Sequence, residues 1–160
     1  MSTTEVFGIK ENGDVVKVGE TEDAMRGAMF IWAQLSGDYD AGSVMDFSPL
    51  WELCDTARMK DKDSLVLKTT FDNVVFMQED IPQMLDAFMD FDKRHPGSSL
   101  PEQAEIVRKQ ILSDDNMIGV CWNQISSIPN AWKVTSPKDH QLEPYNINEQ
   151  SEHWVGKTVN

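Results

Sequence analysis

The chain has 160 residues, of which 27 are Asp or Glu and 14 are Lys or Arg, giving a formal net charge of −13. So much negative charge repels nucleic-acid phosphates and anionic lipid headgroups and attracts basic proteins, which argues against direct nucleic-acid or membrane binding. The length fits one domain, and 40% hydrophobic residues with only two cysteines exclude an intrinsically disordered chain and a disulfide-stapled scaffold.

The N-terminal part predicts a β-hairpin followed by a helix. Residues 4–19 alternate apolar and polar side chains around Asn12-Gly13, and Asn-Gly is typical of two-residue hairpin turns in which both central residues take positive φ angles. Thr21 follows as a candidate N-cap. Apolar residues then recur with helical spacing up to Gly37, at Met25, Ala28, Met29, Trp32 and Leu35.

The next segment predicts a loop over residues 37–46 and a second helix. Ser48-Pro49 provides an N-cap and a proline at the first helical position. We expect this helix to end at the charged residues 60–63, with Trp51 off its buried stripe and Cys54 in the core. The stripe itself consists of Leu50, Leu53, Cys54 and Ala57.

Residues 64–70 and 74–78 are rich in β-branched and apolar side chains and predict a second pair of strands, with one continuous bent strand as the alternative. A third helix is predicted to end before His95, with Ile81, Met84, Leu85, Phe88 and Phe91 on its buried face. The sequence from Ser99 to Glu102 is that of a capping box and predicts a fourth helix, which buries Leu100, Ala104, Val107 and Ile111.

The last part of the chain predicts a strand over residues 117–122 and a turn with a short strand around Pro129-Asn130. We expect one α+β domain over residues 1–136 and an extended C-terminal tail over residues 137–160 docked on it. The domain is expected to hold an antiparallel or mixed sheet of about five strands packed by about four helices, in the order ββ-α-α-ββ-α-α-β.

The sequence gives no strong indication of a metal or cofactor site. Residues 38–42 begin like a calcium-binding loop, but Gly42 is one position early and Pro49 occupies the position of the closing Glu. The histidines lack the spacing of zinc ligands, since they lie far apart at His95, His140 and His153. We therefore predict neither a metal nor a cofactor.

An enzyme with dispersed catalytic residues is an alternative hypothesis, drawing on Cys121, His153, Glu152 or Asn123. A thiol nucleophile needs a nearby base and an electropositive setting, and so acidic a chain supplies the opposite field. A buried structural role is therefore favoured for Cys54 and Cys121. Nucleophile-elbow and phosphate-loop motifs do not occur in the sequence.

Six carboxylates form the candidate partner-binding face. Asp86 and Asp90 are four residues apart on the predicted third helix, opposite its apolar stripe, where like charges cost roughly a few tenths of a kcal/mol. Together with neighbouring acidic residues they predict a surface for Arg- and Lys-rich partners, made of Glu79, Asp80, Asp86, Asp90, Asp114 and Asp115. The alternative is a merely solvated helix face, the commoner role of a charge row.

Three classes of function are compatible with these observations. We favour an acidic, non-enzymatic module that blocks a basic surface of a partner protein, as toxin-immunity proteins and phage inhibitors of defence enzymes do; a nucleic-acid-processing enzyme is a candidate partner. A structural or assembly subunit and the dispersed enzyme are the alternatives. No apolar run reaches the length of a membrane span and no basic leader precedes one, so we expect a soluble, cytoplasmic protein; a homodimer stays open.

Overall fold

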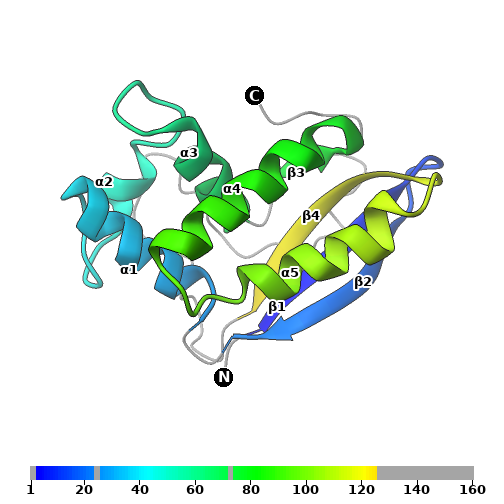
Figure 1. Ribbon diagram of the computed structural model, residues 1–160, viewed down its shortest axis with the longest axis horizontal. Helices are drawn as coiled ribbons and strands as arrows, with labels where there is room; N and C mark the ends of the chain where they lie inside the picture. The colour runs from blue at the N-terminus through cyan, green and yellow to red at the C-terminus, as the bar shows by residue number, and fades with distance from the viewer. Residues whose placement is uncertain (1–2, 24–25, 72–73, 126–160) are drawn as a thin grey trace.

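The computed structural model describes residues 3–23, 26–71 and 74–125, which form a single α+β domain (Figure 1). Within these ranges one antiparallel sheet holds four strands in the order β2-β1-β4-β3. The strands are β1 (Thr3–Lys10), β2 (Val15–Glu22), β3 (Val75–Met77) and β4 (Met117–Ile125). The last described strand therefore lies in the interior of the sheet, between the first strand and the short edge strand β3.

The hairpin of β1 and β2 is confirmed, but its turn differs from the prediction. Three residues, Glu11–Gly13, form the loop, and the N–H of Lys10 donates to the carbonyl of Asp14 at 2.8 Å. Gly13 takes a φ of +94°, whereas Asn12 has no positive φ. The side chain of Asn12 stabilises the turn instead, because its Oδ1 accepts the N–H of Asp14 at 3.0 Å.

The first helix begins later than predicted. Strand β2 continues to Glu22, and α1 spans Ala28–Tyr39. Thr21 does not cap this helix, because its hydroxyl donates to the buried carboxylate of Asp23 at 3.0 Å. The hydroxyl of Thr4 lies 2.6 Å from the other oxygen of Asp23. Asp23 thus ties the start of β1 to the end of β2.

The predicted second helix is reduced to one turn, α2 (Ser48–Trp51). Asp55 takes a left-handed φ of 60°, a conformation that a right-handed helix cannot continue through. Trp51 does not lie off the buried face: it is 1% exposed, and its ring centroid lies 5.0 Å from that of Trp32. Cys54 is buried, as predicted.

The prediction of a strand over residues 64–70 was wrong, because this segment belongs to helix α3 (Asp61–Lys68) and the turn after it. Val66 and Leu67 are fully buried in a cluster that includes side chains of α4. Tertiary packing has overridden the β propensity of these residues. The described part of the sheet therefore has four strands where about five were expected, and β3 pairs with β4 alone.

The next helices agree with the prediction. Helix α4 (Ile81–Arg94) follows the 3-10 turn Gln78–Asp80, and α5 (Leu100–Val107) continues into a π-helical turn, Arg108–Leu112. The capping box is not formed, although the start of α5 is correct. The hydroxyl oxygen of Ser98 accepts the N–H of Leu100 at 3.2 Å, and Glu102 pairs with Arg26 instead of capping.

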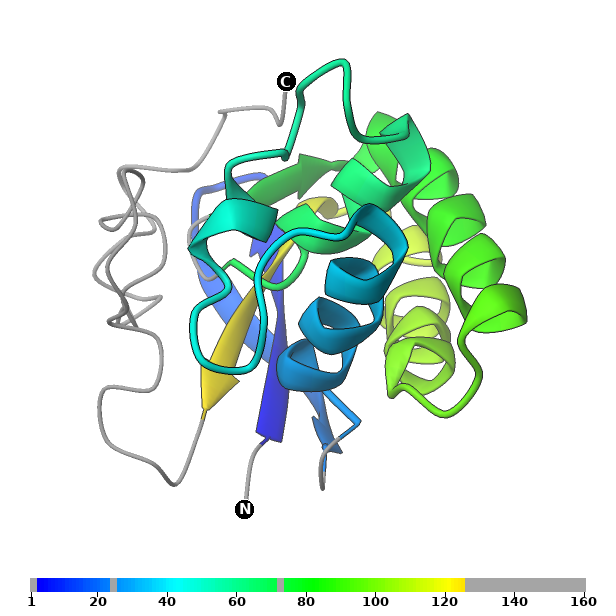
Figure 2. The ribbon, with the colours of Figure 1, turned by 90° about the vertical axis from the view of Figure 1, so that its left-hand side faces the viewer.

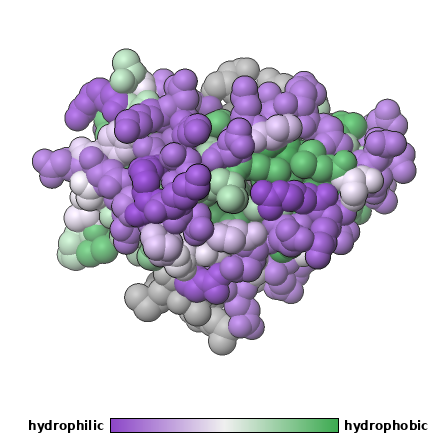
Figure 3. Space-filling model, viewed as in Figure 1, coloured by the Kyte–Doolittle hydropathy of each residue, from purple (hydrophilic) through white to green (hydrophobic). Residues whose placement is uncertain are grey.

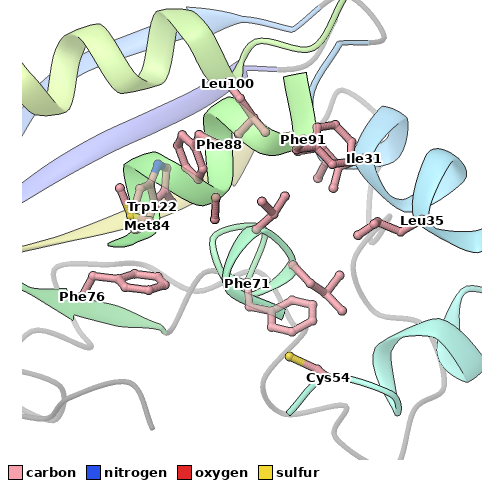
Figure 4. Close-up of a cluster of buried hydrophobic side chains, with 14 of the residues drawn as sticks. Ile31, Leu35, Cys54, Phe71, Phe76, Met84, Phe88, Phe91, Leu100 and Trp122 are labelled. Atoms are coloured by element: carbon pink, nitrogen blue, oxygen red, sulfur yellow. The ribbon is translucent and has the colours of Figure 1, made fainter. Parts of the chain in front are cut away.

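Helices α4 and α5 lie against one face of the sheet, and the main core fills the space between them (Figure 2). Figure 4 shows Trp122 of β4 among Phe76, Met84 and Phe88. The ring centroids of Trp122 and Phe76 are 5.7 Å apart. The strand alternation places a smaller apolar cluster on the other face, consisting of Phe7, Ile9, Val75 and Cys121.

Within the described ranges, none of the helices combines the length and the apolar content of a membrane span. The predicted turn around Pro129-Asn130 and the predicted tail over residues 137–160 lie outside the described residues. The same holds for the boundary between domain and tail at residue 136, so these expectations remain predictions.

Candidate interaction surfaces

Three acidic segments meet at one end of the sheet. At the tip of the hairpin, the N–H of Glu11 donates to the carbonyl of Asn116, in the turn before β4, at 3.0 Å. Gln78 reaches the same turn, since its Nε2 donates to the carbonyl of Met117 at 2.9 Å and lies 3.4 Å from that of Ile111. The hairpin tip, the 3-10 turn before α4 and the turn before β4 are therefore neighbours, at the upper right of Figure 1.

We call the acidic residues of these segments the sheet-end carboxylates: Glu11, Asp14, Glu79, Asp80, Asp114 and Asp115. All six are exposed or half-buried. Across the described ranges, none of them forms an ion pair with Lys, Arg or His. Their hydrogen bonds are local: Asp114 Oδ1 accepts the N–H of Asn116 at 2.9 Å. Their negative charge is thus left without an internal counter-ion in this part of the chain.

Four of the six residues predicted as a partner-binding face belong to this group, namely Glu79, Asp80, Asp114 and Asp115. Asp86 is exposed on α4, about 9 Å further along the helix axis than Asp80. Asp90 lies in a different setting, because its Oδ2 is 3.2 Å from Nη2 of Arg94. The structure therefore brings the segments of four of these carboxylates together, whereas Asp86 lies further along α4 and Asp90 is paired with Arg94.

Asp90 is part of a cluster, which we call the Arg94 cluster, made of Arg94, Asp38, Asp63, Asp90 and His95. The guanidinium bonds Asp63 of α3 and lies 3.1 Å from Asp38 of α1, and Asp38 also lies 2.7 Å from Nε2 of His95. Burial lowers the pKa of Arg94, but attraction to Asp63, Asp90 and Asp38 outweighs this and raises it. The cluster therefore joins three helices through charge-assisted hydrogen bonds.

Asp63 is the buried member of this cluster, at 2% exposure. Its Oδ2 accepts the hydroxyl of Tyr39 at 2.5 Å, and that hydroxyl accepts the N–H of Lys60 at 3.0 Å. Burial, and then the hydrogen bond to Asp63, raise the pKa of Tyr39 to about 12. With both carboxylate oxygens of Asp63 satisfied by Tyr39 and Arg94, the arrangement is suited to holding helices together rather than to exchanging protons with a substrate.

A groove of about 540 Å³ lies between β2 and the α5 region. Val18 and Ile106 supply its apolar side chains. Gly19 allows the close approach of Ile106 to β2, since a Cβ at this position would be only 2.9 Å from the Ile106 side chain. Two of its carboxylates are paired with cations: Glu102 with Arg26, and Glu105 with Lys109 at 3.2 Å. Unlike the sheet end, the groove therefore carries largely compensated charge.

The residues of the enzymatic hypothesis are not assembled in the described ranges. Cys121 is 1% exposed on the sheet, and Asn123 donates through Nδ2 to Glu5 at 3.0 Å. His153 and Glu152 lie outside those ranges. Among the described residues, no group of three or more His, Cys, Asp or Glu is arranged to hold a metal ion.

Glu11 and Asp14 were not predicted as part of the acidic face. They meet Asp114 and Asp115 only because β1 and β4, more than a hundred residues apart in the chain, are paired antiparallel. In the sequence, the feature that could have indicated them is that both are acidic and flank the predicted turn at Asn12-Gly13.

The chain matches no protein-family model, no curated protein and no solved structure. A functional proposal therefore depends on the geometry and charge of the chain itself.

Proposed function

We propose that the protein is an acidic, non-enzymatic module that blocks a basic surface of a partner protein, and that the sheet-end carboxylates make the contact. The observation that carries this proposal is the gathering of six carboxylates, from three separate segments, with no ion pair in the described part of the chain. Such a patch repels itself in the free protein, and Arg or Lys side chains of a partner relieve that repulsion.

The net charge of the whole chain supports a protein partner over a nucleic acid. At a net charge of −13, the molecule repels a phosphate backbone over the whole approach, whereas it accelerates the approach of a cationic protein. This attraction weakens as salt rises, because the Debye length falls from about 10 Å at 0.1 M to about 3 Å at 1 M.

Affinity capture from the native host's lysate, at low and at high salt, tests the proposal with the full chain as bait. The sheet-end variant carries Glu79→Gln, Asp80→Asn, Asp114→Asn and Asp115→Asn. The matched control variant carries Glu22→Gln, Asp61→Asn, Asp86→Asn and Asp92→Asn. Both variants lose four negative charges, and the control positions also lack ion pairs among the described residues.

We expect the native chain and the control variant to capture the same basic protein at low salt and to release it at high salt, whereas the sheet-end variant does not retain it. Equal capture by the two variants would show that net charge alone acts, without a specific surface. A metabolite or a carbohydrate polymer as the bound species would overturn the proposal.

A further inference from the structure

The loop between α1 and α2 exposes two large apolar side chains at its tip. Met45 is 88% exposed and Val44 is 70% exposed, while the other exposed large hydrophobic side chains of the described residues reach at most 48%. We call these two residues the apolar apex. Figure 3 shows an apolar projection at the lower left, where Figure 1 places this loop. Contiguous apolar surface that a fold leaves in water often marks an interaction site.

Hydrogen bonds within the loop brace the apex. Ser43 and Asp46 form two backbone hydrogen bonds, of 3.0 and 2.9 Å, across the turn that carries the apex. The hydroxyl oxygen of Ser43 also accepts the N–H of Met45 at 3.2 Å. Phe47 anchors the loop in the core, where it is 4% exposed and its ring centroid lies 5.6 Å from that of Trp32. A partner would therefore meet a preformed projection, which lowers the entropy cost of binding.

Two exposed carboxylates flank this projection in the chain. Asp40 and Asp46 are exposed on either side of the apex, and no Lys, Arg or His occurs in the sequence between Arg26 and Arg58. Hydrogen bonds from the hydroxyl and the backbone N–H of Ser48 lower the pKa of Asp46, so this carboxylate is charged at neutral pH. The apolar tip therefore has a negative rim.

We propose that the apolar apex, Val44 and Met45, inserts into an apolar pocket of a partner protein whose rim carries Lys or Arg. The negative rim of the loop complements such a pocket, and buried apolar anchors with a polar surround are typical of binding hot spots. A second copy of this chain would bring a like-charged rim to the contact, and an anionic lipid surface would repel it. The apex lies at the opposite end of the molecule from the sheet-end carboxylates (Figure 1), so this inference stands apart from the proposed function.

Photo-crosslinking in the host lysate tests this contact. A photoreactive amino acid replaces Met45 in the full chain, and replaces Met89, a 48% exposed methionine on α4, as the matched control. We expect position 45 alone to crosslink to one protein, at an apolar residue with Lys or Arg beside it. Equal crosslinking from both positions, or crosslinks from position 45 only to lipid or to a second copy of the chain, would overturn the inference.

The crosslinked protein is then purified, and its binding kinetics are measured with the variant Val44→Ser/Met45→Ser. Loss of two buried apolar side chains should weaken binding by about tenfold or more for each, through faster dissociation. Met89→Ser should leave the affinity unchanged, and an unchanged affinity in the Val44/Met45 variant would refute the inference. The sheet-end variant is measured against the same protein. Its result bears on the proposed function alone, so the two failures are distinguishable.

Discussion

Two groups of carboxylates in this molecule have opposite surroundings. In the Arg94 cluster, Asp38, Asp63 and Asp90 all contact one guanidinium. At the sheet end, six carboxylates lie on three neighbouring turns, and none has an ion pair among the described residues. The first group shares a cation within the fold, and the second presents its charge to the surroundings without one.

The different surroundings suit the Arg94 cluster to stabilising the fold and the sheet-end carboxylates to binding a partner. Buried or half-buried charges that are paired hold elements together, and removing one partner leaves a costly isolated charge. Exposed charges without partners contribute little to folding but create a field outside the molecule. Substitutions in the Arg94 cluster should therefore change the free energy of unfolding, whereas substitutions at the sheet end should change association.

The largest effect on stability is expected for Arg94→Met, which removes the cation that neutralises Asp63. Since Asp63 is 2% exposed, its carboxylate would be left buried without a counter-charge, at a cost of about 3 kcal/mol. Urea unfolding measures this difference. Arg108→Met is the control: Arg108 lies 3.9 Å from Glu105 on the surface, and we expect a change below about 0.5 kcal/mol. Equal effects of the two substitutions would contradict the assigned role of the cluster.

A smaller effect is expected for Tyr39→Phe, which removes the hydroxyl between Lys60 and Asp63 and should cost about 1 kcal/mol at neutral pH. Because the pKa of Tyr39 is raised from 10.0 to about 12 in the folded state, the unfolded chain releases this proton first. The stability due to this group is complete below pH 10 and is lost as the pH rises toward 12. Urea unfolding across this window should show a steeper decline for the native chain than for the variant. Parallel declines would show that the pKa of Tyr39 is not raised in the folded state.

The smallest effect on stability is expected for the sheet-end variant. Its four substitutions remove charges that lack ion pairs in the described ranges, and Asn at position 114 still accepts the N–H of Asn116. We expect the free energy of unfolding to change by less than about 0.5 kcal/mol. A loss of several kcal/mol in urea unfolding would place the sheet-end carboxylates among the stabilising interactions and would remove the contrast with the Arg94 cluster.

The parts of the fold that were predictable from sequence are those in which local pattern and tertiary packing agree. Helix α4 has an apolar stripe at helical spacing, and α5 follows two serines and has a proline as its second residue, so both positions were correct. Leu67 shows the opposite case. Its segment is rich in β-branched and apolar residues and predicted a strand, yet Leu67 is buried in α3 against other helices. Trp51 was predicted to lie off the buried stripe of a long second helix. The observed helix is a single turn, so the predicted stripe is not formed.

The candidate surface was predictable only in part for a similar reason. Glu79 and Asp80 are adjacent in the chain, and their charge is evident from sequence. Their proximity to Asp114 and to the hairpin tip depends on the strand order β2-β1-β4-β3 and on the hydrogen bonds of Gln78. The pairing of Asp90 with Arg94 and the separation of the two carboxylate groups are likewise tertiary properties.

The association rate constant of the captured partner, measured against ionic strength, tests the central claim most directly. For the native chain and the control variant, we expect fast association that slows steeply as salt rises. For the sheet-end variant, we expect slower association with a much weaker dependence on salt. If the sheet-end and control variants give the same rates and the same salt dependence, the sheet-end carboxylates are not the binding surface.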